Sequence, residues 1–233
     1  MSEELERISF GLMIAALFIV GFNTMQINSL VGEKNSLATA SVSNTVTGNV
    51  ISSVVSTTQI QQSQVSGIDV APKGVPSIYG EELKVSFDDV SVTNPQKADA
   101  TINKLGVLDD QITLSAEEMT RYIDIAGRIS CEYCCGAASI IFPNGNAACG
   151  CAHSYAMRGL AKYLLKNHGS EYTNDQILDE LGKWKTLFFP GPTAAKAKIL
   201  KDKGIELNYI NLASNKYRGI EKGTGGSSMV GGC

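Results

Sequence analysis

The feature that most constrains this chain is a concentration of thiol and imidazole side chains between Cys131 and His153. These 23 residues contain five of the six cysteines and one of the two histidines. Thiolates and imidazoles are the ligands that zinc, copper(I) and iron–sulfur clusters select. The ligand-type residues form two short motifs, Cys131-Glu-Tyr-Cys134-Cys135 and Cys149-Gly-Cys151-Ala-His153. The pattern predicts a single thiol-rich site that is built from both motifs.

A metal site is the interpretation that this clustering favours. Four ligands suffice for tetrahedral zinc, and two or three thiolates suffice for copper(I). An iron–sulfur cluster is the weaker alternative and requires a reducing compartment. We expect the metal to be bound rather than used in turnover. The candidate ligands are Cys131, Cys134, Cys135, Cys149, Cys151 and His153.

Two other interpretations of the cysteines stay open. Outside the cytoplasm thiols tend to oxidise, so the cysteines would staple a surface module that binds another protein. The enzymatic alternative is a thiol–disulfide oxidoreductase using Cys131 and Cys134, which have the Cys-x-x-Cys spacing. No βαβ pattern surrounds that motif. Covalent haem is excluded because Cys135 stands where Cys-x-x-Cys-His requires histidine.

Composition excludes other classes of function. The net charge is −3 and the sequence pI is about 5.5, with no basic patch, so nucleic-acid binding has no support. The chain also lacks a Gly-x-Ser-x-Gly motif, a His-Glu-x-x-His motif and a phosphate-binding loop. Neither hydrolase nor nucleotide-binding chemistry is indicated by these motifs.

The N-terminus predicts a membrane anchor over residues 1–34. Ile8 to Phe22 is free of charge and mostly apolar, and the uncharged stretch continues to Gly32, which is long enough to cross a bilayer. A cleaved signal peptide is the rival, but the preceding residues are net acidic and no small-residue cleavage motif follows closely. No Lys or Arg occurs between Asn35 and Pro72, so we expect the bulk of the chain outside the cytoplasm.

Three further segments follow the predicted anchor. Residues 35–72 are rich in Ser, Thr and Gln and offer too little apolar surface to offset the cost of ordering, which predicts a flexible linker. Residues 73–218 are expected to form a small, mainly α-helical domain that carries the cysteines. Residues 219–233 form a Gly-rich tail that we expect to be disordered. Met229 and Cys233 in this tail are soft donors within possible reach of the site.

Capping patterns and apolar periodicity predict the helices of the domain. Ser115 and Thr173 each begin a capping box, which predicts helices from Ala116 to Gly127 and over the residues after Thr173. Pro95 opens a predicted helix to about Lys104, and Thr193 caps a short one to about Lys203. The clearest helix follows Cys151, with an apolar stripe at Met157, Leu160, Ala161, Leu164 and Leu165.

Alternation of apolar and polar residues predicts two short strands. These are Leu83 to Phe87 and Ile205 to Ile210, which we expect to pair. Trp184 and Met157 are expected in the core, whereas Lys183 and Lys185 are expected on solvated helix flanks. The predicted fold class is therefore mainly α, with an N-terminal transmembrane helix, a disordered linker and at most one strand pair in the domain.

The two cysteine motifs also carry a resemblance. Residues 131–136, 148–160, 177–185 and 188–191 resemble a Cys-rich family of membrane-anchored archaeal or candidate-phylum proteins and, more loosely, the PCYCGC-motif lipoproteins of Gram-positive bacteria. Those lipoproteins also set a cysteine cluster before a helix. This chain departs from them because no Pro precedes its cluster, a long insert divides it, and no lipobox Cys follows the apolar run. The resemblance implies an extracytoplasmic, metal-binding protein and no particular activity.

Overall fold

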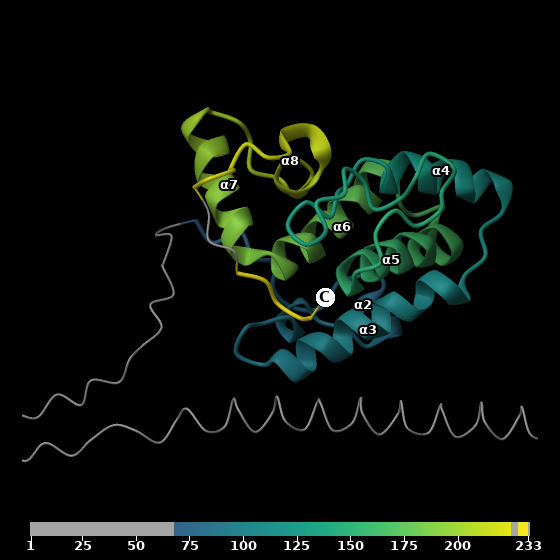
Figure 1. Ribbon diagram of the computed structural model, residues 1–233. Coiled ribbons are helices and arrows are strands. Elements are labelled where there is room, and N and C mark those ends of the chain that lie inside the picture. Colours follow the sequence, from purple (N-terminus) through teal and green to yellow (C-terminus); the bar gives the residue numbers. More distant parts are fainter. Residues whose placement is uncertain (1–67, 225–227, 233) are drawn as a thin grey trace, which may run out of the picture. The chain divides into compact units, whose positions relative to one another are not determined.

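The computed structural model of this protein describes residues 68–224 and 228–232. The predicted anchor and most of the predicted linker therefore lie outside the described residues. Within them, the chain is helical, as Figure 1 shows. The elements are α2 (Gly80–Leu83), η2 (Phe87–Asp89), α3 (Pro95–Gln111), α4 (Ala116–Ala126), α5 (Ala152–His168), α6 (Asn174–Phe188), α7 (Pro190–Asp202), α8 (Tyr209–Ala213) and η3 (Asn215–Tyr217).

The predicted helix starts are confirmed except that of α7, and side-chain caps explain most of them. Ser115 accepts a hydrogen bond from the backbone N–H of Glu118, whose carboxylate accepts from the Ser115 N–H in return. Thr173 and Gln176 form the same reciprocal pair before α6. α3 runs seven residues past its predicted end at Lys104, and α7 begins at Pro190, ahead of the predicted Thr193 cap. Proline at the first position of α3 and of α7 is preset for a helix.

The predicted strand pair is wrong. No strand occurs in residues 68–224 or 228–232, where only isolated bridges are found. The first segment turns at Lys84, which has a φ of 50°, and a capping box at Ser86 then starts the 3-10 helix η2. The second segment is irregular until Asn208 caps α8. In both places local capping by a polar side chain prevails over the alternating pattern.

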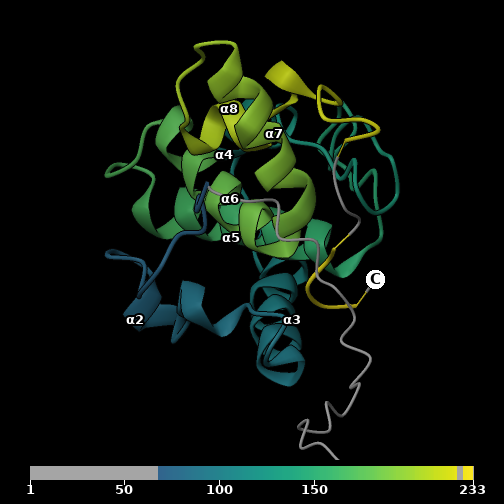
Figure 2. The ribbon, with the colours of Figure 1, turned by 90° about the vertical axis from the view of Figure 1, so that its left-hand side faces the viewer.

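The core lies between α3, α4, α5 and α6. The predicted stripe of α5 is buried throughout, and Met157 and Trp184 are core residues as expected. α3 and α5 form the most extensive helix pair. Their close approach depends on Gly159, because a Cβ atom there would lie 2.1 Å from the carbonyl oxygen of Leu105. Figure 2 shows α3 below α5 and α6, with α7 and α8 toward the top of the view.

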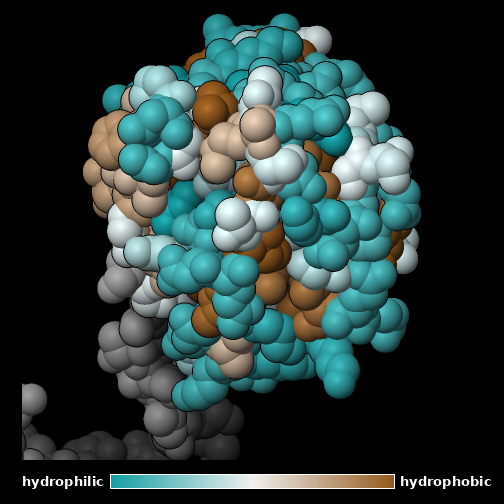
Figure 3. Space-filling model, turned by 90° about the vertical axis from the view of Figure 1, so that its right-hand side faces the viewer, coloured by the Kyte–Doolittle hydropathy of each residue, from teal (hydrophilic) through white to brown (hydrophobic). Residues whose placement is uncertain are grey.

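The surface of the described part is mixed. Figure 3 shows one face on which hydrophilic residues surround smaller groups of hydrophobic ones. The large hydrophobic side chains that are most exposed are Val75, Val92, Val107, Phe142 and Met229, which come from separate parts of the sequence. In the described ranges, none of the helices is long and apolar enough to cross a membrane.

Candidate metal centre

The cysteine loop, residues 127–151, connects α4 to α5 and brings the two motifs together. Backbone hydrogen bonds fold it back on itself, from the N–H of Ile140 to the carbonyl of Ile129 (3.0 Å) and from the N–H of Ala148 to the carbonyl of Ile140 (3.1 Å). Ile129 also forms a bridge with Ser214, the residue that ends α8. The loop is thereby fastened to the domain at both ends without any regular strand.

Cys151 is the N-cap residue of α5. Its sulfur accepts a hydrogen bond from the backbone N–H of Ser154 at 3.4 Å, the contact that a capping oxygen would usually make. The unpaired N–H groups and partial positive charge at a helix N-terminus favour a thiolate over a thiol. The expected position of Cys151 at the start of this helix is confirmed, and it places there a sulfur that could ligate a metal.

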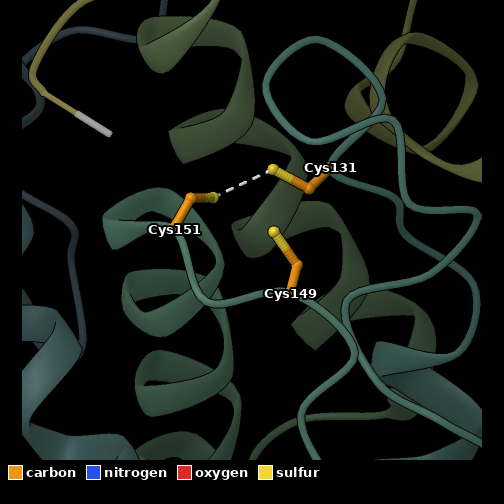
Figure 4. Close-up of side chains that lie close together, drawn as sticks. All are labelled: Cys131, Cys149 and Cys151. Carbon is orange, nitrogen blue, oxygen red and sulfur yellow. Dashed lines mark hydrogen bonds between the residues drawn. The ribbon is translucent and has the colours of Figure 1, made fainter.

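Three sulfur atoms converge in front of this helix end. The sulfurs of Cys131 and Cys151 lie 3.1 Å apart. That of Cys149 points toward them, as Figure 4 shows, and all three lie within 4.8 Å of one another. Cys131 is fully buried, and Cys149 and Cys151 are nearly so. The two motifs, distant in sequence, therefore meet in space.

His153 belongs to a second group that shares Cys151. Ligand atoms of Cys134, Cys151 and His153 also lie within 4.8 Å of one another. The imidazole lies between the rings of Phe188 and Phe189, at 4.9 Å from each centroid. Its Nε2 is 2.8 Å from the carbonyl oxygen of Val230. Because a carbonyl only accepts, Nε2 carries the proton of this bond, which leaves Nδ1 as the ring nitrogen that could ligate a metal.

The oxidation states of the cysteines differ. Cys135 and Cys149 form a disulfide. Cys134 is not a free thiol either, whereas Cys131 and Cys151 are free. Cys135 is exposed and belongs to neither convergent group. Of the six predicted ligands, five thus contribute to one or the other group, and Cys134 and Cys149 can ligate only when their disulfides are reduced.

The free pair shares a single proton unequally. The hydrogen bond from Cys131 lowers the pKa of the Cys151 thiol, and the bonds that Cys151 forms with His153 and Ser154 act in the same direction. The same interaction with Cys151, together with burial, raises the pKa of Cys131. The pair therefore holds one negative charge, on Cys151, at neutral pH. A buried thiolate beside an imidazole is the donor type that soft and borderline cations prefer.

A cluster of buried charges surrounds Glu132, which belongs to the first cysteine motif. The carboxylate of Glu132 lies 3.1 Å from the amines of both Lys185 and Lys196, and both lysines are almost completely buried. Lys196 also lies 3.4 Å from Glu221. Burial lowers the pKa of Lys185 to about 8. The expectation that Lys185 lies on a solvated flank of its helix is wrong. Its acidic partner, Glu132, belongs to the cysteine loop, and the periodicity of the helix alone does not reveal that contact.

A second buried cation holds the other motif. Arg158 pairs with Asp109 of α3 at 2.7 Å and donates a hydrogen bond to the carbonyl of Cys149 at 2.8 Å. It thus ties α3, α5 and the cysteine loop together. Sequence reasoning missed both Arg158 and Asp109. One signal in the sequence pointed to a buried arginine. Arg158 follows Met157 directly, so it lies at the edge of the apolar stripe of α5, where a side chain can be partly or fully buried.

The C-terminal residues close over the site. Val230 is buried, its N–H donates to the carbonyl of Phe188 at 2.9 Å, and its carbonyl accepts from His153. The N–H of Gly232 donates to Asp99 of α3, and Figure 2 shows this segment beside α3. The expected disorder of the tail is therefore wrong for residues 228–232. A cavity of about 390 Å³ opens beside Gly150 and Ala152, between α3 and the start of α5.

Comparison with known proteins adds no relative. No protein-family model matches the chain, and no curated protein or solved structure is significantly similar to it. The resemblance to membrane-anchored Cys-rich proteins and to PCYCGC-motif lipoproteins therefore stays a prediction from the motifs. What the described residues show is a buried cysteine and histidine group that could hold a metal ion, beside one disulfide.

Proposed function

We propose that this protein binds one soft transition-metal ion, copper(I) or zinc, between the cysteine loop and the start of α5. The observation that carries the proposal is the convergence of three sulfurs within 4.8 Å, with Cys151 shared between them and the group that contains His153. Sulfur–zinc bonds of ~2.3 Å in tetrahedral geometry place ligand sulfurs roughly 3.8 Å apart. The spacing of the sulfurs is compatible with that value after small side-chain adjustments.

The surroundings of the group support binding rather than turnover. Cys131, Cys149 and His153 are buried, and His153 donates its Nε2 proton to a backbone carbonyl, which fixes the ring as in many metal sites. A bound ion would supply positive charge to the Cys151 thiolate and would displace the proton that Cys131 shares with it. A buried site of this kind suits a metal that is held in place better than one that must admit a substrate.

The cellular setting belongs to the same proposal. The uncharged N-terminal run and the following positive-free segment support a single-pass anchor with the domain outside the cytoplasm. In that setting copper(I) handling is the sharper function, because thiolates and imidazole select it. The reduced state of Cys134 and Cys149 then has to be supplied or maintained, since extracytoplasmic thiols tend to oxidise.

The test is a metal titration of the full chain. Protein reduced under anaerobic conditions is titrated with copper(I), and separately with zinc, against a chromophoric chelator of known affinity. We expect about one equivalent of ion to bind, and Cys151→Ser to weaken binding at least tenfold because Cys151 belongs to both convergent groups.

Cys135→Ser is the matched control. Cys135 lies outside both groups, so its loss should leave the metal affinity within about threefold of that of the reduced wild-type chain. Stoichiometry far below one, or equal affinity in the wild type and in Cys151→Ser, contradicts the proposal.

A further inference from the structure

A free dithiol lies directly beside a disulfide in this site. Cys131 and Cys151 are both free thiols, with their sulfurs 3.1 Å apart. Cys149, which is bonded to Cys135, places its sulfur within 4.8 Å of both. In the described residues, therefore, the thiols of Cys131 and Cys151 and the Cys135–Cys149 disulfide share a single space. Thiols in such contact with a disulfide are placed to exchange with it.

We propose that these four cysteines form an internal dithiol–disulfide relay, which transfers the disulfide between the outer pair Cys135–Cys149 and the buried pair Cys131–Cys151. The relay goes beyond metal binding because it proceeds without an ion. It also differs from an oxidoreductase centred on Cys131 and Cys134, because the exchanging partner of Cys131 is Cys151, at the start of α5.

The relay consists of two exchange steps. First, the Cys151 thiolate attacks the sulfur of Cys149, a new Cys149–Cys151 bond forms, and Cys135 leaves as a thiolate that takes up the proton Cys151 gave up. Second, the Cys131 thiolate attacks the sulfur of Cys151, and Cys149 leaves and takes the proton from Cys131. Two thiols are oxidised and one disulfide is reduced to two thiols, so electrons and protons balance without an external oxidant.

The burial of the two pairs gives the relay a direction in space. Cys135 is exposed, whereas Cys131 is completely buried. A disulfide at Cys135 can therefore be reached by an external thiol, and the same oxidising equivalent moved to Cys131–Cys151 cannot. The relay converts an accessible disulfide into a protected one and releases Cys135 at the surface as a thiol. The class of external reactant that fits the exposed sulfur is a thiol or a disulfide in solution.

The experiment maps disulfides in the full chain without metal. Oxidised protein is held with a strong chelator under anaerobic conditions for several hours, a period that covers uncatalysed exchange. It is then quenched in acid, alkylated and digested with chymotrypsin and thermolysin. Cleavage after Tyr133 by chymotrypsin and before Ile140 by thermolysin places Cys131, Cys135 and the Cys149/Cys151 pair on three different peptides, and tandem mass spectrometry of the linked peptides then distinguishes Cys149 from Cys151.

Two serine variants test the assigned order. In the wild type we expect both Cys135–Cys149 and Cys131–Cys151, with an unchanged total of free thiols. Cys131→Ser should stop after the first step and accumulate Cys149–Cys151 with Cys135 alkylated. Cys151→Ser should retain Cys135–Cys149 and leave Cys135 unlabelled. Circular dichroism checks that each variant keeps its helix content.

The proposal is overturned by either of two results. One is Cys135–Cys149 as the only bond among these four sulfurs in both the wild type and Cys131→Ser. The other is a Cys131–Cys149 bond in Cys151→Ser, which would make Cys131 the first nucleophile. Because the mapping is done in chelator, exchange without metal binding refutes only the metal site, and metal binding without exchange refutes only the relay.

Discussion

Cys151 combines three tasks in one side chain. Its sulfur caps α5, accepts a hydrogen bond from Cys131 and belongs to both convergent ligand groups. A serine would keep the cap, because a hydroxyl accepts from the same N–H groups. The substitution would nonetheless remove the nucleophile and the soft ligand. Variants at this residue therefore separate the stability of the helix from the chemistry of the site.

Glu132 is the residue on which the buried charge cluster depends. Its carboxylate neutralises Lys185 and Lys196, both of which are buried. We expect Glu132→Gln to lower the free energy of unfolding by about 3 kcal/mol or more, since it leaves two buried ammonium groups with one remaining acid, Glu221. Denaturant unfolding measures the loss. Glu117→Gln, an exposed change on α4, should stay within about 0.5 kcal/mol of the wild type, and equal effects of the two substitutions would contradict this role.

At the scale of elements, capping residues and periodicity were sufficient to predict most helices but not the strands. Ser115, Thr173 and Pro95 act locally, so the sequence shows their effect directly. The alternation of Leu83 to Phe87 lacks any partner strand, because residues 205–208 are irregular and α8 follows them. Strand pairing depends on distant residues, and the local pattern of one segment does not show them.

The α3–α5 pair is predicted to be intolerant of a side chain at Gly159. A Cβ atom there would meet the backbone of Leu105 at 2.1 Å, whereas at Gly106 the nearest atom is the Cβ of Tyr155 at 3.3 Å. We expect Gly159→Ala to destabilise by about 2 kcal/mol despite the gain in helix propensity. Gly106→Ala is the matched control on the other helix and should be nearly neutral. Denaturant titrations of the two variants give their unfolding midpoints. Equal midpoints would show that α3 and α5 move apart at little cost in free energy.

At the scale of the whole molecule, the site is assembled from segments that are far apart in the sequence. The two motifs and their convergence at the start of α5 follow from the residues themselves, since thiols crowd only there. The pairing of Cys135 with Cys149 and the burial of Arg158 and Lys185 do not, because each requires knowledge of how the cysteine loop folds. Closure by Val230 was hidden by the glycines around it, which suggest a chain too poor in apolar surface to order.

That closure predicts how access to the thiols is controlled. Val230 is buried next to His153, and burying a valine contributes about 1.5 kcal/mol or more. Val230→Asp should therefore raise the population in which this segment opens by about tenfold, since 1.4 kcal/mol is one factor of ten. Native alkylation of Cys151, followed by mass spectrometry, should accelerate in proportion. Lys222→Asp places the same carboxylate at an exposed position of the tail and should leave the rate unchanged. If both variants react at the wild-type rate, reagents enter instead through the cavity beside Gly150, and the C-terminal segment does not guard the site.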